Sequence, residues 1–193
     1  MMDLEIFLCR HGETDWTVSG QHTSRTDLPL NAKGREQAER LRQRIGKDGW
    51  SAVLSSPMKR CIMTSEILGL EPAIEPRAVE WNYGDYEGLT SPEIGKKRPG
   101  WNLFSDGAPE GETPEQVGAR ADALLEELKK KEGKIVLVSH GHFLRVLAVR
   151  WMGLPVSTGA LFSLSVASLG KLGYEKGKPV LKLWNDVSHL EKL

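Results

Sequence analysis

The segment LEIFLCRHG, residues 4–12, joins an apolar run to an arginine, a histidine and a glycine. The run Leu4–Cys9 predicts a buried β-strand, so the Arg-His-Gly triplet would stand at its carboxyl end. The run Lys134–Val138 has the same form and leads into SHGH at residues 139–142. Ligands of open α/β sheets bind beyond the carboxyl ends of the strands, so both strand ends are candidate site positions.

Short apolar runs alternate with amphipathic segments along the rest of the chain. Helices are predicted after Asn31, after Ser56-Pro57, after the capping box that begins at Thr113, and from near His142 to Gly153. The alternation predicts an α/β fold: a three-layer sandwich with a mostly parallel central sheet, helices on both faces and an inserted lid. The further predicted strands are Ala52–Leu54 and three that form antiparallel edges, Leu161–Leu169, Lys171–Glu175 and Val180–Trp184.

Length and charge narrow the class of protein. The chain has 193 residues with 26 basic and 26 acidic side chains, which gives a formal net charge of zero. This length predicts one domain over residues 1–193, with a core large enough to fold on its own. The balanced charge argues against nucleic acid as a partner, because nucleic-acid-binding proteins normally carry a clear basic excess.

The composition of the chain indicates its cellular compartment and whether it associates with a membrane. The two cysteines, Cys9 and Cys61, lie among apolar residues, and no CxxC pair or disulfide framework is present. The start of the chain, Met1–Glu5, lacks the basic region of a signal peptide. The longest weakly apolar segment, Ala160–Leu169, is too short to span a bilayer. We therefore expect a soluble, cytoplasmic protein with no membrane partner.

The segment from about residue 80 to residue 112 follows neither the helical nor the strand period. It is rich in glycine, proline and aromatic residues, among them Trp81, Tyr83, Tyr86 and Trp101. Ordered loops of this length are more often lids or binding loops than simple connectors. Most of these aromatics could equally pack the segment onto the sheet, and Tyr83 is the best candidate to touch a ligand.

Four residues of the predicted sheet edge suit an anion. Arg10 and His11 follow the first strand, Arg60 lies one turn into the helix after the second, and His140 follows the Lys134–Val138 strand. Glycines let the backbone approach a ligand closely, and helix N-termini favour anions. A strand-end histidine can also be only a polar cap, and Arg60 could be a solvated helix residue. Their shared position at one edge favours a phosphate site.

Other site chemistries find less support. His140 and His142 could form half of a metal site, but alternate residues of an extended segment point to opposite faces, and no HExxH or HxxEH pattern occurs. We therefore predict no metal and no cofactor. GxSxG, GxxxxGK[ST] and GxGxxG are also absent, which leaves nucleotide-driven phosphoryl transfer through a P-loop unsupported.

Four ordered blocks of the chain resemble the histidine phosphatase superfamily, also called phosphoglycerate mutase-like. The blocks are LCRHGET (8–14), SSPMKR (55–60), EWNYGDYEG (80–88) and SHGH (139–142). The triplet RHG alone would be common by chance, whereas four blocks in the family's order and spacing are specific. The resemblance supports the predicted fold.

The resemblance also implies a catalytic set. His11 would be the nucleophile that forms a phosphohistidine, and Arg10, Arg60 and His140 would hold the phosphoryl oxygens. Glu80 would protonate the leaving oxygen and then activate water, a role that the residues alone do not indicate. Such an enzyme needs no metal and acts on a phosphate ester.

Three activities share this architecture: phosphatase, mutase and inert phosphoryl-binding module. The mutases usually have asparagine where this chain has Thr17, and they are longer, which argues against mutase activity. The catalytic positions are all present, which argues against the inert module. We therefore expect a phosphomonoester hydrolase that acts on small sugar phosphates.

Within the phosphatases the chain looks most like the sedoheptulose 1,7-bisphosphatase branch, through the segment from Ser19 to Leu30 and the blocks around residues 80–88, 101–107 and 111–113. In that branch the residues matching Thr23, Ser24 and Tyr83 line the substrate, and the one matching Arg145 meets a distal phosphate. Arg145 could equally be a solvated helix residue. A broad-specificity sugar-phosphate phosphatase and a protein phosphohistidine phosphatase remain alternatives.

Overall fold

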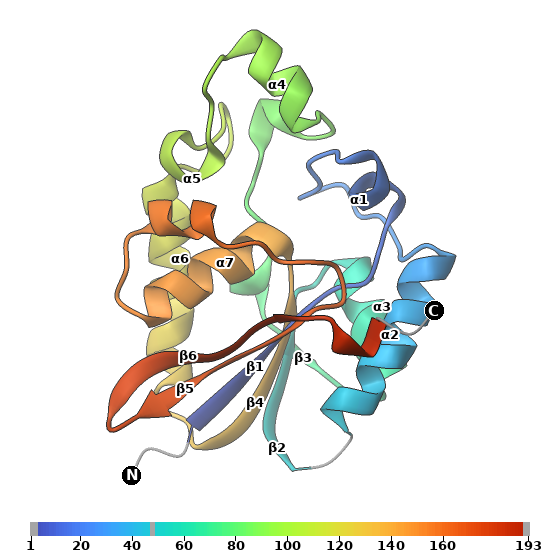
Figure 1. Cartoon of the computed structure of the whole chain (residues 1–193), viewed down its shortest axis with the longest axis vertical. Helices are drawn as coiled ribbons and strands as arrows, with labels where there is room; N and C mark the ends of the chain where they lie inside the picture. The colour runs from blue at the N-terminus through green and yellow to red at the C-terminus, as the bar shows by residue number, and fades with distance from the viewer. Residues whose placement is uncertain (1–3, 47–48, 191–193) are drawn as a thin grey trace.

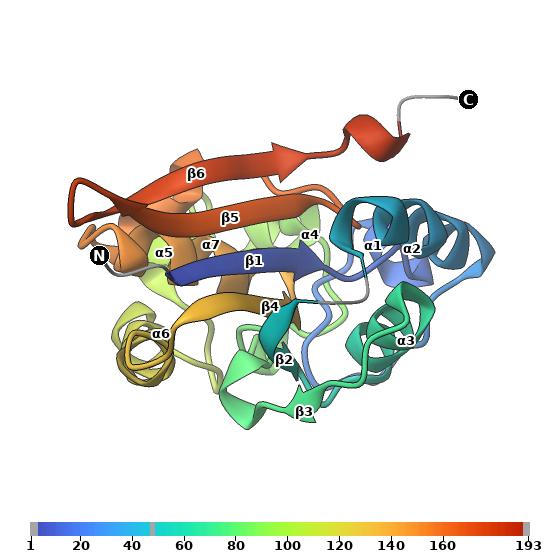
Figure 2. The same ribbon diagram turned by 90° about the horizontal axis from the view of Figure 1, so that it is seen from below.

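The computed structural model describes residues 4–46 and 49–190. Its centre is one six-stranded sheet with the strand order β3-β2-β4-β1-β5-β6, and Figure 2 shows the strands side by side in this order. The expectation that Met1–Asp3 carry no basic leader concerns residues outside the described ranges. The strands are β1 (Leu4–Arg10), β2 (Trp50–Ser55), β3 (Ala73–Ile74), β4 (Gly133–Ser139), β5 (Leu169–Glu175) and β6 (Lys178–Asp186).

The sheet is mostly parallel, as the sequence predicts. Strand β1 pairs in parallel with β4, and β2 pairs in parallel with both β4 and β3. Strand β5 runs antiparallel to β1 and to β6, which confirms the antiparallel edge. The carboxyl ends of β1, β2 and β4 therefore meet at one edge of the sheet.

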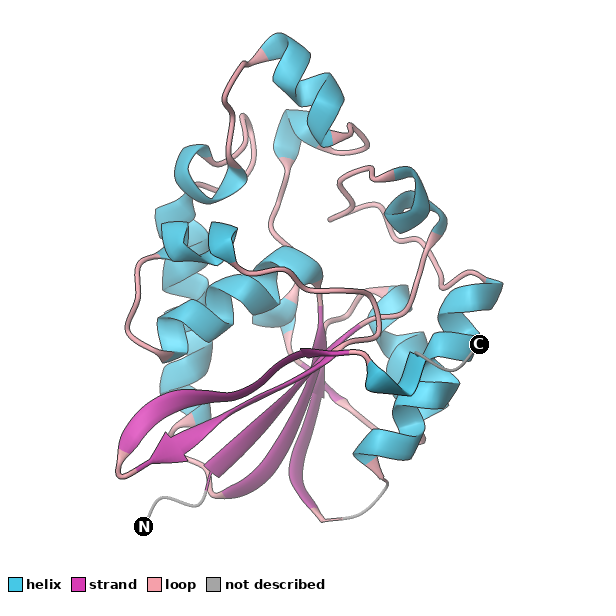
Figure 3. Cartoon of the chain, viewed as in Figure 1, coloured by secondary structure: helices cyan, strands magenta, loops and turns pink. Residues whose placement is uncertain are grey.

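Helices cover both faces of the sheet, so the three-layer architecture is confirmed (Figure 1 and Figure 3). One face carries α2 (Ala32–Ile45) and α3 (Lys59–Leu68), and the other carries α6 (Pro114–Leu128) and α7 (Gly141–Trp151). Asn31 caps α2 through a hydrogen bond from the Gly34 amide, and Thr113 forms the predicted capping box of α6.

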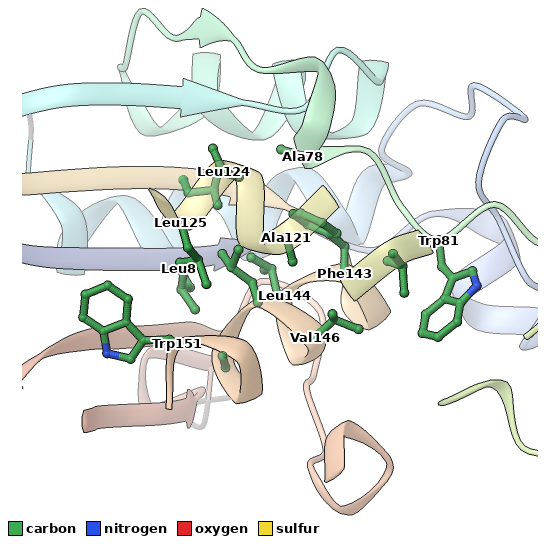
Figure 4. Packing of buried hydrophobic residues seen from close by; sticks show 14 of the residues in the cluster. Leu8, Ala78, Trp81, Ala121, Leu124, Leu125, Phe143, Leu144, Val146 and Trp151 are labelled. Carbon is green, nitrogen blue, oxygen red and sulfur yellow. The ribbon is translucent and has the colours of Figure 1, made fainter. Parts of the chain in front are cut away.

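The alternation of side chains along the central strands explains the two layers. In β1, Leu4, Ile6 and Leu8 belong to the apolar cluster with α6 and α7, whereas Cys9 belongs to the cluster with α2 and α3. Strand β4 divides in the same way, because successive residues of a strand point to opposite faces. Figure 4 shows the larger cluster, where Leu124 and Leu125 of α6 lie beside Phe143, Leu144 and Trp151 of α7.

Short helices surround the carboxyl edge of the sheet. Above it lies α4 (Ser91–Lys97), with α5 (Leu103–Asp106) and α1 (Asp15–Ser19) on either side (Figure 1). The capping box between Thr90 and Glu93 is a local signal for α4 that the absence of a helical period had hidden. The remaining short turns are 3₁₀ helices: η1 (Pro76–Ala78), η2 (Gly84–Tyr86), η3 (Val156–Leu161) and η4 (Ser188–Leu190). No helix of the described chain is both long and apolar enough to cross a bilayer.

The predicted strand Leu161–Leu169 is wrong. Its residues alternate between apolar and small polar types, but only Leu169 joins a strand. The backbone of residues 164 and 165 bonds to side chains instead of to a neighbouring strand: the Ser165 amide donates to Asn185 Oδ1, and the Leu164 carbonyl accepts from Arg10. An alternating pattern therefore marks an extended connection here.

The helix predicted to start at Ser56-Pro57 begins two residues later. Met58 is the N-cap of α3 and makes no side-chain capping bond. The Ser56 hydroxyl lies 2.7 Å from His140 Nε2 and only 3.4 Å from the Met58 amide. The Ser56 hydroxyl therefore bonds more closely to His140 at the sheet edge than to the backbone at the start of α3.

The first prediction concerns the stability of the large cluster. Leu124 is fully buried between α6 and the sheet, so Leu124→Ala should lower the free energy of unfolding by about 2–5 kcal/mol through lost contacts and a cavity. Denaturant unfolding followed by circular dichroism measures this change. Leu161→Ala is the matched control, because Leu161 is 84% exposed, and its change should stay within about 0.5 kcal/mol. Equal losses in the two variants would contradict the described core.

Candidate active site

Five residues from separate parts of the chain meet at the carboxyl edge of the sheet. Arg10 ends β1 and His11 follows it, while His140 lies between β4 and α7. The rings of His11 and His140 lie 5.2 Å apart between centroids, and Arg60 Nε lies 3.2 Å from His140 Nδ1. Glu80 reaches the same place from the connection after η1. The structure thus brings the five predicted catalytic residues together.

His11 is held as a neutral ring with one free nitrogen. Its Nδ1 lies 2.7 Å from the Gly12 carbonyl, which can only accept, so Nδ1 carries the proton. Nε2 then holds a lone pair, and no hydrogen bond of the described residues engages it. Burial, followed by the positive charges of Arg60 and Arg10, sets the pKa of His11 well below its ordinary value of 6.5. His11 is therefore a ready nucleophile at neutral pH.

The loop that carries His11 lies against the start of α2 at glycines. A Cβ on Gly12 would lie 2.3 Å from the Gly34 carbonyl oxygen, and one on Gly34 would lie 2.1 Å from the Glu13 carbonyl oxygen. Both contacts involve backbone atoms and cannot be relieved by a side-chain rotation. Glycine at both positions is what lets the strand end and the helix meet.

Arg10 contributes a buried donor without an acceptor. Its Nη1 donates to the Leu164 carbonyl, and its Nε is buried with no hydrogen-bond partner. The guanidinium lies over Gly141, where a Cβ would come within 3.1 Å of its central carbon. Burial lowers the pKa of Arg10, although Glu80 opposes this effect. A buried, unpaired guanidinium N–H is costly unless a ligand accepts from it.

A connection of six residues, which we call the strap (163–168), holds Arg10 and His11 in place. The Arg10 amide donates to the Ser168 carbonyl, and the Ala167 amide donates to the His11 carbonyl at 3.0 Å. Ala167 adopts φ = 51°, a conformation that non-glycine residues rarely take. Three side chains from the end of the described chain fix the strap: Trp184, Asn185 and His189.

Arg60 is fully buried and organises the loop beside it. Its guanidinium donates to the carbonyls of Thr23, Ser24 and Thr26 and, through Nε, to His140 Nδ1. Four donor contacts satisfy most of its five N–H groups. Arg60 therefore sets both the positive charge behind the site and the path of residues 23–26.

His140 is fully buried and both of its ring nitrogens have protein partners. Nδ1 accepts from Arg60, so Nε2 carries the proton and donates to Ser56 Oγ at 2.7 Å. Burial and the charge of Arg60 lower the pKa of His140 well below 6.5. The Cys61 sulfur lies 3.5 Å from Nε2, and burial raises the pKa of that thiol to about 12, so the thiol stays protonated. His140 is thus a neutral hydrogen-bond donor.

Glu80 caps α7 from a distant part of the chain. The N-cap residue of α7, His140, makes no side-chain capping bond. Glu80 takes that place: Oε2 accepts from the His142 amide at 3.0 Å, and Oε1 accepts from the Phe143 amide at 2.8 Å and the Trp81 amide at 2.9 Å. Helix N-termini attract carboxylates because their first amides are unpaired. Oε2 keeps the one lone pair that these bonds leave free.

A cavity of about 210 Å³ opens beside these residues. Arg10, His11 and Glu80 line it, and so do three of the four predicted substrate residues, Thr23, Tyr83 and Arg145. Ser24 does not line it, because its amide bonds to Glu87 and its hydroxyl to the Glu80 carbonyl. Arg60 and His140 lie beneath the wall. The other lining residues are Trp16, Thr17, Gly20, Gln21, His22, Ser91, Gly141, His142 and Leu164.

Two histidines of this cavity were not predicted as site residues. His142 Nδ1 lies 2.6 Å from Tyr83 Oη and 3.9 Å from Glu80 Oε2, and its ring stacks on that of His22 at 5.9 Å. Burial lowers the pKa of His142 and raises that of Tyr83 well above 10. The His140-Gly-His142 spacing draws attention to His142, but as a pattern it indicates only half of a metal site. His142 instead borders the proposed acid.

Arg145 is both a cavity residue and a tether. Its Nε donates to the Gly159 carbonyl and its Nη2 to the Ala160 carbonyl, which fastens η3 to α7. The guanidinium also lies 4.3 Å from the centre of the Phe104 ring. These contacts use two of its five N–H groups, so the remaining donors can face the cavity. The solvated-helix interpretation is wrong for this residue.

Within residues 4–46 and 49–190, no group of three or more histidine, cysteine or acidic side chains is placed to hold a metal ion. His140 hydrogen-bonds with Arg60 and Ser56, and His142 hydrogen-bonds with Tyr83. The two histidines lie at the start of α7. The site thus combines buried cationic donors with a neutral imidazole that has a free nitrogen and with a carboxyl group.

The family model of the histidine phosphatase superfamily (branch 1) matches residues 6–187. This chain belongs to that superfamily. The match spans the strand of His11, the Glu80 segment and the His140 helix, which are the elements that form the site. The resemblance of the four sequence blocks is thereby confirmed.

Individual relatives carry different activity names. An acid phosphatase of Mycobacterium tuberculosis is 38% identical over 179 residues, covering 89% of this chain and 87% of its own length. The sedoheptulose 1,7-bisphosphatase of Saccharomyces cerevisiae is 36% identical, covering 77% of this chain and 68% of its own length. A probable phosphoglycerate mutase GpmB of an Enterobacter species is 31% identical, with 97% and 95% covered. A solved structure of a Mycobacterium tuberculosis open reading frame matches with a TM-score of 0.87 at 36% identity, covering 94% of this chain and 96% of that one.

The second prediction concerns stability and pH. The folded pKa values of His11, His140 and His142 lie below 6.5, so the unfolded chain takes up protons first as the pH falls through 6.5. Stability is therefore lost on acidification, by about 1.4 kcal/mol per histidine and up to about 4 kcal/mol between about pH 7.5 and pH 5.5. Denaturant unfolding at the two pH values measures the loss.

The variant His142→Gln provides a matched control for this measurement. It removes one of the three groups, so the loss between the two pH values should shrink by about 1.4 kcal/mol. A wild-type chain that is equally stable at both pH values would show that these rings are charged in the folded state.

Proposed function

We propose that the protein is a phosphomonoester hydrolase that acts on small sugar phosphates through a phosphohistidine on His11. One observation carries this proposal. The neutral His11, with Nε2 unpaired, lines the same small cavity as Arg10, whose buried Nε lacks an acceptor. A phosphoryl group would accept from that N–H while its phosphorus lies next to the histidine lone pair.

The first step transfers the phosphoryl group to the protein. His11 Nε2 forms a bond to phosphorus while the ester P–O bond breaks, and the electron pair of that bond goes to the leaving oxygen. In this proposal Glu80 begins the step protonated at Oε2, the position that its three amide bonds leave free, and gives that proton to the leaving oxygen, which becomes an alcohol. The in-line displacement needs donors for the negative charge on the three remaining oxygens.

The second step returns the histidine. A water molecule attacks phosphorus, the P–N bond breaks with its electrons returning to His11 Nε2, and the Glu80 carboxylate takes the proton of the water. The products are inorganic phosphate and the protonated acid, ready for another turnover. One carboxyl group thus serves as acid and then as base.

Fixed positive charge favours both transition states. Arg10 contacts the phosphoryl site directly in this proposal, and Arg60 adds a second charge behind His140. In the same proposal His140 turns its Nε2–H from Ser56 toward a phosphoryl oxygen. Preorganised donors of this kind are worth about 10²–10³ in rate each.

The cavity favours a small polar substrate. Thr23, Tyr83 and Arg145 would contact its sugar portion, and the free donors of Arg145 would suit a second anionic group. The relative named acid phosphatase supports a phosphatase, and the relative named sedoheptulose 1,7-bisphosphatase supports a sugar phosphate, with sedoheptulose 1,7-bisphosphate as one candidate. Ser24 would act by shaping the loop beside Glu80.

Phosphoglycerate mutase activity is the second candidate, and relatives with that name support it. The hydroxyl of Thr17 argues against it, because its Oγ1 accepts from the Thr14 amide and donates to the Thr14 carbonyl. The side chain at this cavity position is therefore committed to the cap of α1. The usual asparagine of the mutases would present a longer amide to the substrate.

The proposal also covers organisation and location. We take residues 1–193 as one domain in which residues 80–112 form the lid over the cavity. The two cysteines Cys9 and Cys61 are buried and unpaired, which is consistent with a reducing compartment such as the cytoplasm. Metal independence belongs to the same proposal.

The third prediction tests the nucleophile. His11→Ala should abolish phosphate release, and Arg60→Ala should lower kcat by about 10²–10³ because a fixed positive charge is lost. Brief incubation of the wild type with a ³²P-labelled ester, followed by alkaline quenching, should trap an acid-labile phosphoprotein that His11→Ala does not form. Turnover of wild-type magnitude in His11→Ala would exclude the mechanism.

The fourth prediction tests substrate class and metal. Phosphate release should occur with sugar mono- and bisphosphates and with an aryl phosphate, and EDTA should leave the rates unchanged. Loss of activity in EDTA that added metal restores would exclude the metal-free mechanism. Conversion of 3-phosphoglycerate to its 2-isomer without phosphate release would indicate the mutase instead.

A further inference from the structure

Two residues outside the cavity wall of His11, Arg120 of α6 and Glu112 just before it, hold the backbone on both sides of Glu80. We infer that they are positioning residues which aim the Glu80 carboxyl group at the leaving oxygen. The inference rests on the proposed acid role of Glu80. It adds to the working site two residues that do not line the cavity of His11.

Arg120 hydrogen-bonds to the backbone that leads into Glu80. Its Nη1 donates to the carbonyls of Arg77 at 2.7 Å and Val79 at 2.8 Å, and its Nη2 contacts the Glu80 carbonyl at 3.4 Å. The side chain is only 15% exposed. Carbonyls of three residues in a span of four are thus tied to one guanidinium, so the chain before Glu80 has a fixed path.

Glu112 hydrogen-bonds to the two residues that follow Glu80. Its Oε2 accepts from the Asn82 amide at 2.9 Å, and its backbone carbonyl accepts from Trp81 Nε1 at 2.9 Å. Its carboxylate also receives Arg120 in a two-pronged bond, Nε to Oε1 at 2.8 Å and Nη2 to Oε2 at 2.7 Å. The ion pair therefore links the two flanks of Glu80 into one frame.

The same guanidinium also supports a group that Glu80 binds. Arg120 lies 4.6 Å from the centre of the Phe143 ring, and the Phe143 amide donates to Glu80 Oε1. Arg120 consequently touches both the chain that carries the carboxyl group and the residue that receives it. A shift of this one side chain would change the distance between them.

An arginine is needed for this arrangement. The five contacts of Arg120 use the planar fork of a guanidinium, whose five N–H groups point in fixed directions. A lysine would keep the positive charge but could not bridge Glu112 and the three carbonyls together. Arg120→Lys therefore loosens Glu80 while preserving charge, and Glu112→Gln weakens the pair from the other side.

The experiment separates proton donation from general damage by changing the leaving group. A sugar phosphate leaves as an alkoxide and needs a proton, whereas 2,4-dinitrophenyl phosphate releases a stable phenolate. Arg120→Lys should lower kcat/KM for the sugar phosphate by about 10²-fold, the scale of a displacement of about 1 Å in a catalytic group. Its kcat/KM for the dinitrophenyl ester should fall only a few-fold, and Glu112→Gln should show the same selective loss.

Two further variants serve as a control and as a reference for this experiment. Arg150→Lys is the matched control, because Arg150 makes a similar two-pronged bond to Asp122 between α7 and α6, away from Glu80; it should leave the ratio of the two kcat/KM values unchanged. Glu80→Gln should show the strongest selective loss. If Glu80→Gln lowers both esters equally, the proposed acid role fails and the inference falls with it. If Glu80→Gln is selective but Arg120→Lys and Glu112→Gln lower both esters equally or neither, the inference alone is wrong.

Discussion

The parallel pairing of β1 with β4 is the constraint on which the site depends. Arg10 stands directly opposite Ser139 in this register, and the His11 amide donates to the Ser139 carbonyl. His11 and the segment of His140 are therefore neighbours because two strands end together. A slip of one residue would exchange the faces of every side chain in the strand and separate the two histidines.

The elements that follow from burial could be predicted from the sequence. The strands of His11 and His140 are apolar on both faces, and the helices after Asn31 and Thr113 have local caps, so their places follow from short-range rules. Strand-end positions then locate Arg10, His11 and His140 without any knowledge of tertiary contacts. The position of Glu80 could not be found in this way, because its partners are amides of a helix sixty residues away.

The misassigned residues share a physical cause. The alternating residues 161–168 look like a strand because apolar and polar types alternate, yet the backbone of residues 164 and 165 bonds to the side chains of Arg10 and Asn185. Ser56 looks like a helix cap, yet its hydroxyl binds His140. Local pattern cannot report a partner that lies far along the chain, and catalytic sites are rich in such partners.

Although the formal net charge of the chain is zero, charge is distributed unevenly inside the protein. Arg60 is fully buried and Arg10 is half-buried, and burial together with their positive charge favours the neutral form of His11 and His140. A neutral imidazole has a lone pair that it can donate. The carboxyl group of Glu80 lines the same cavity as Arg10.

The strap makes the site depend on segments that lie far apart along the chain, which affects when the site forms during folding. Residues 10 and 11 leave the ribosome early, but their strand neighbours lie at 133–139 and 169–172, and the side chains that fix the strap lie at 184–189. Contacts of such long sequence separation form slowly, since a large loop must close before they are gained. The candidate site is therefore complete only after most of the chain has been synthesised. Under the proposed function, a partly folded chain would have no working site with which to attack phosphate esters.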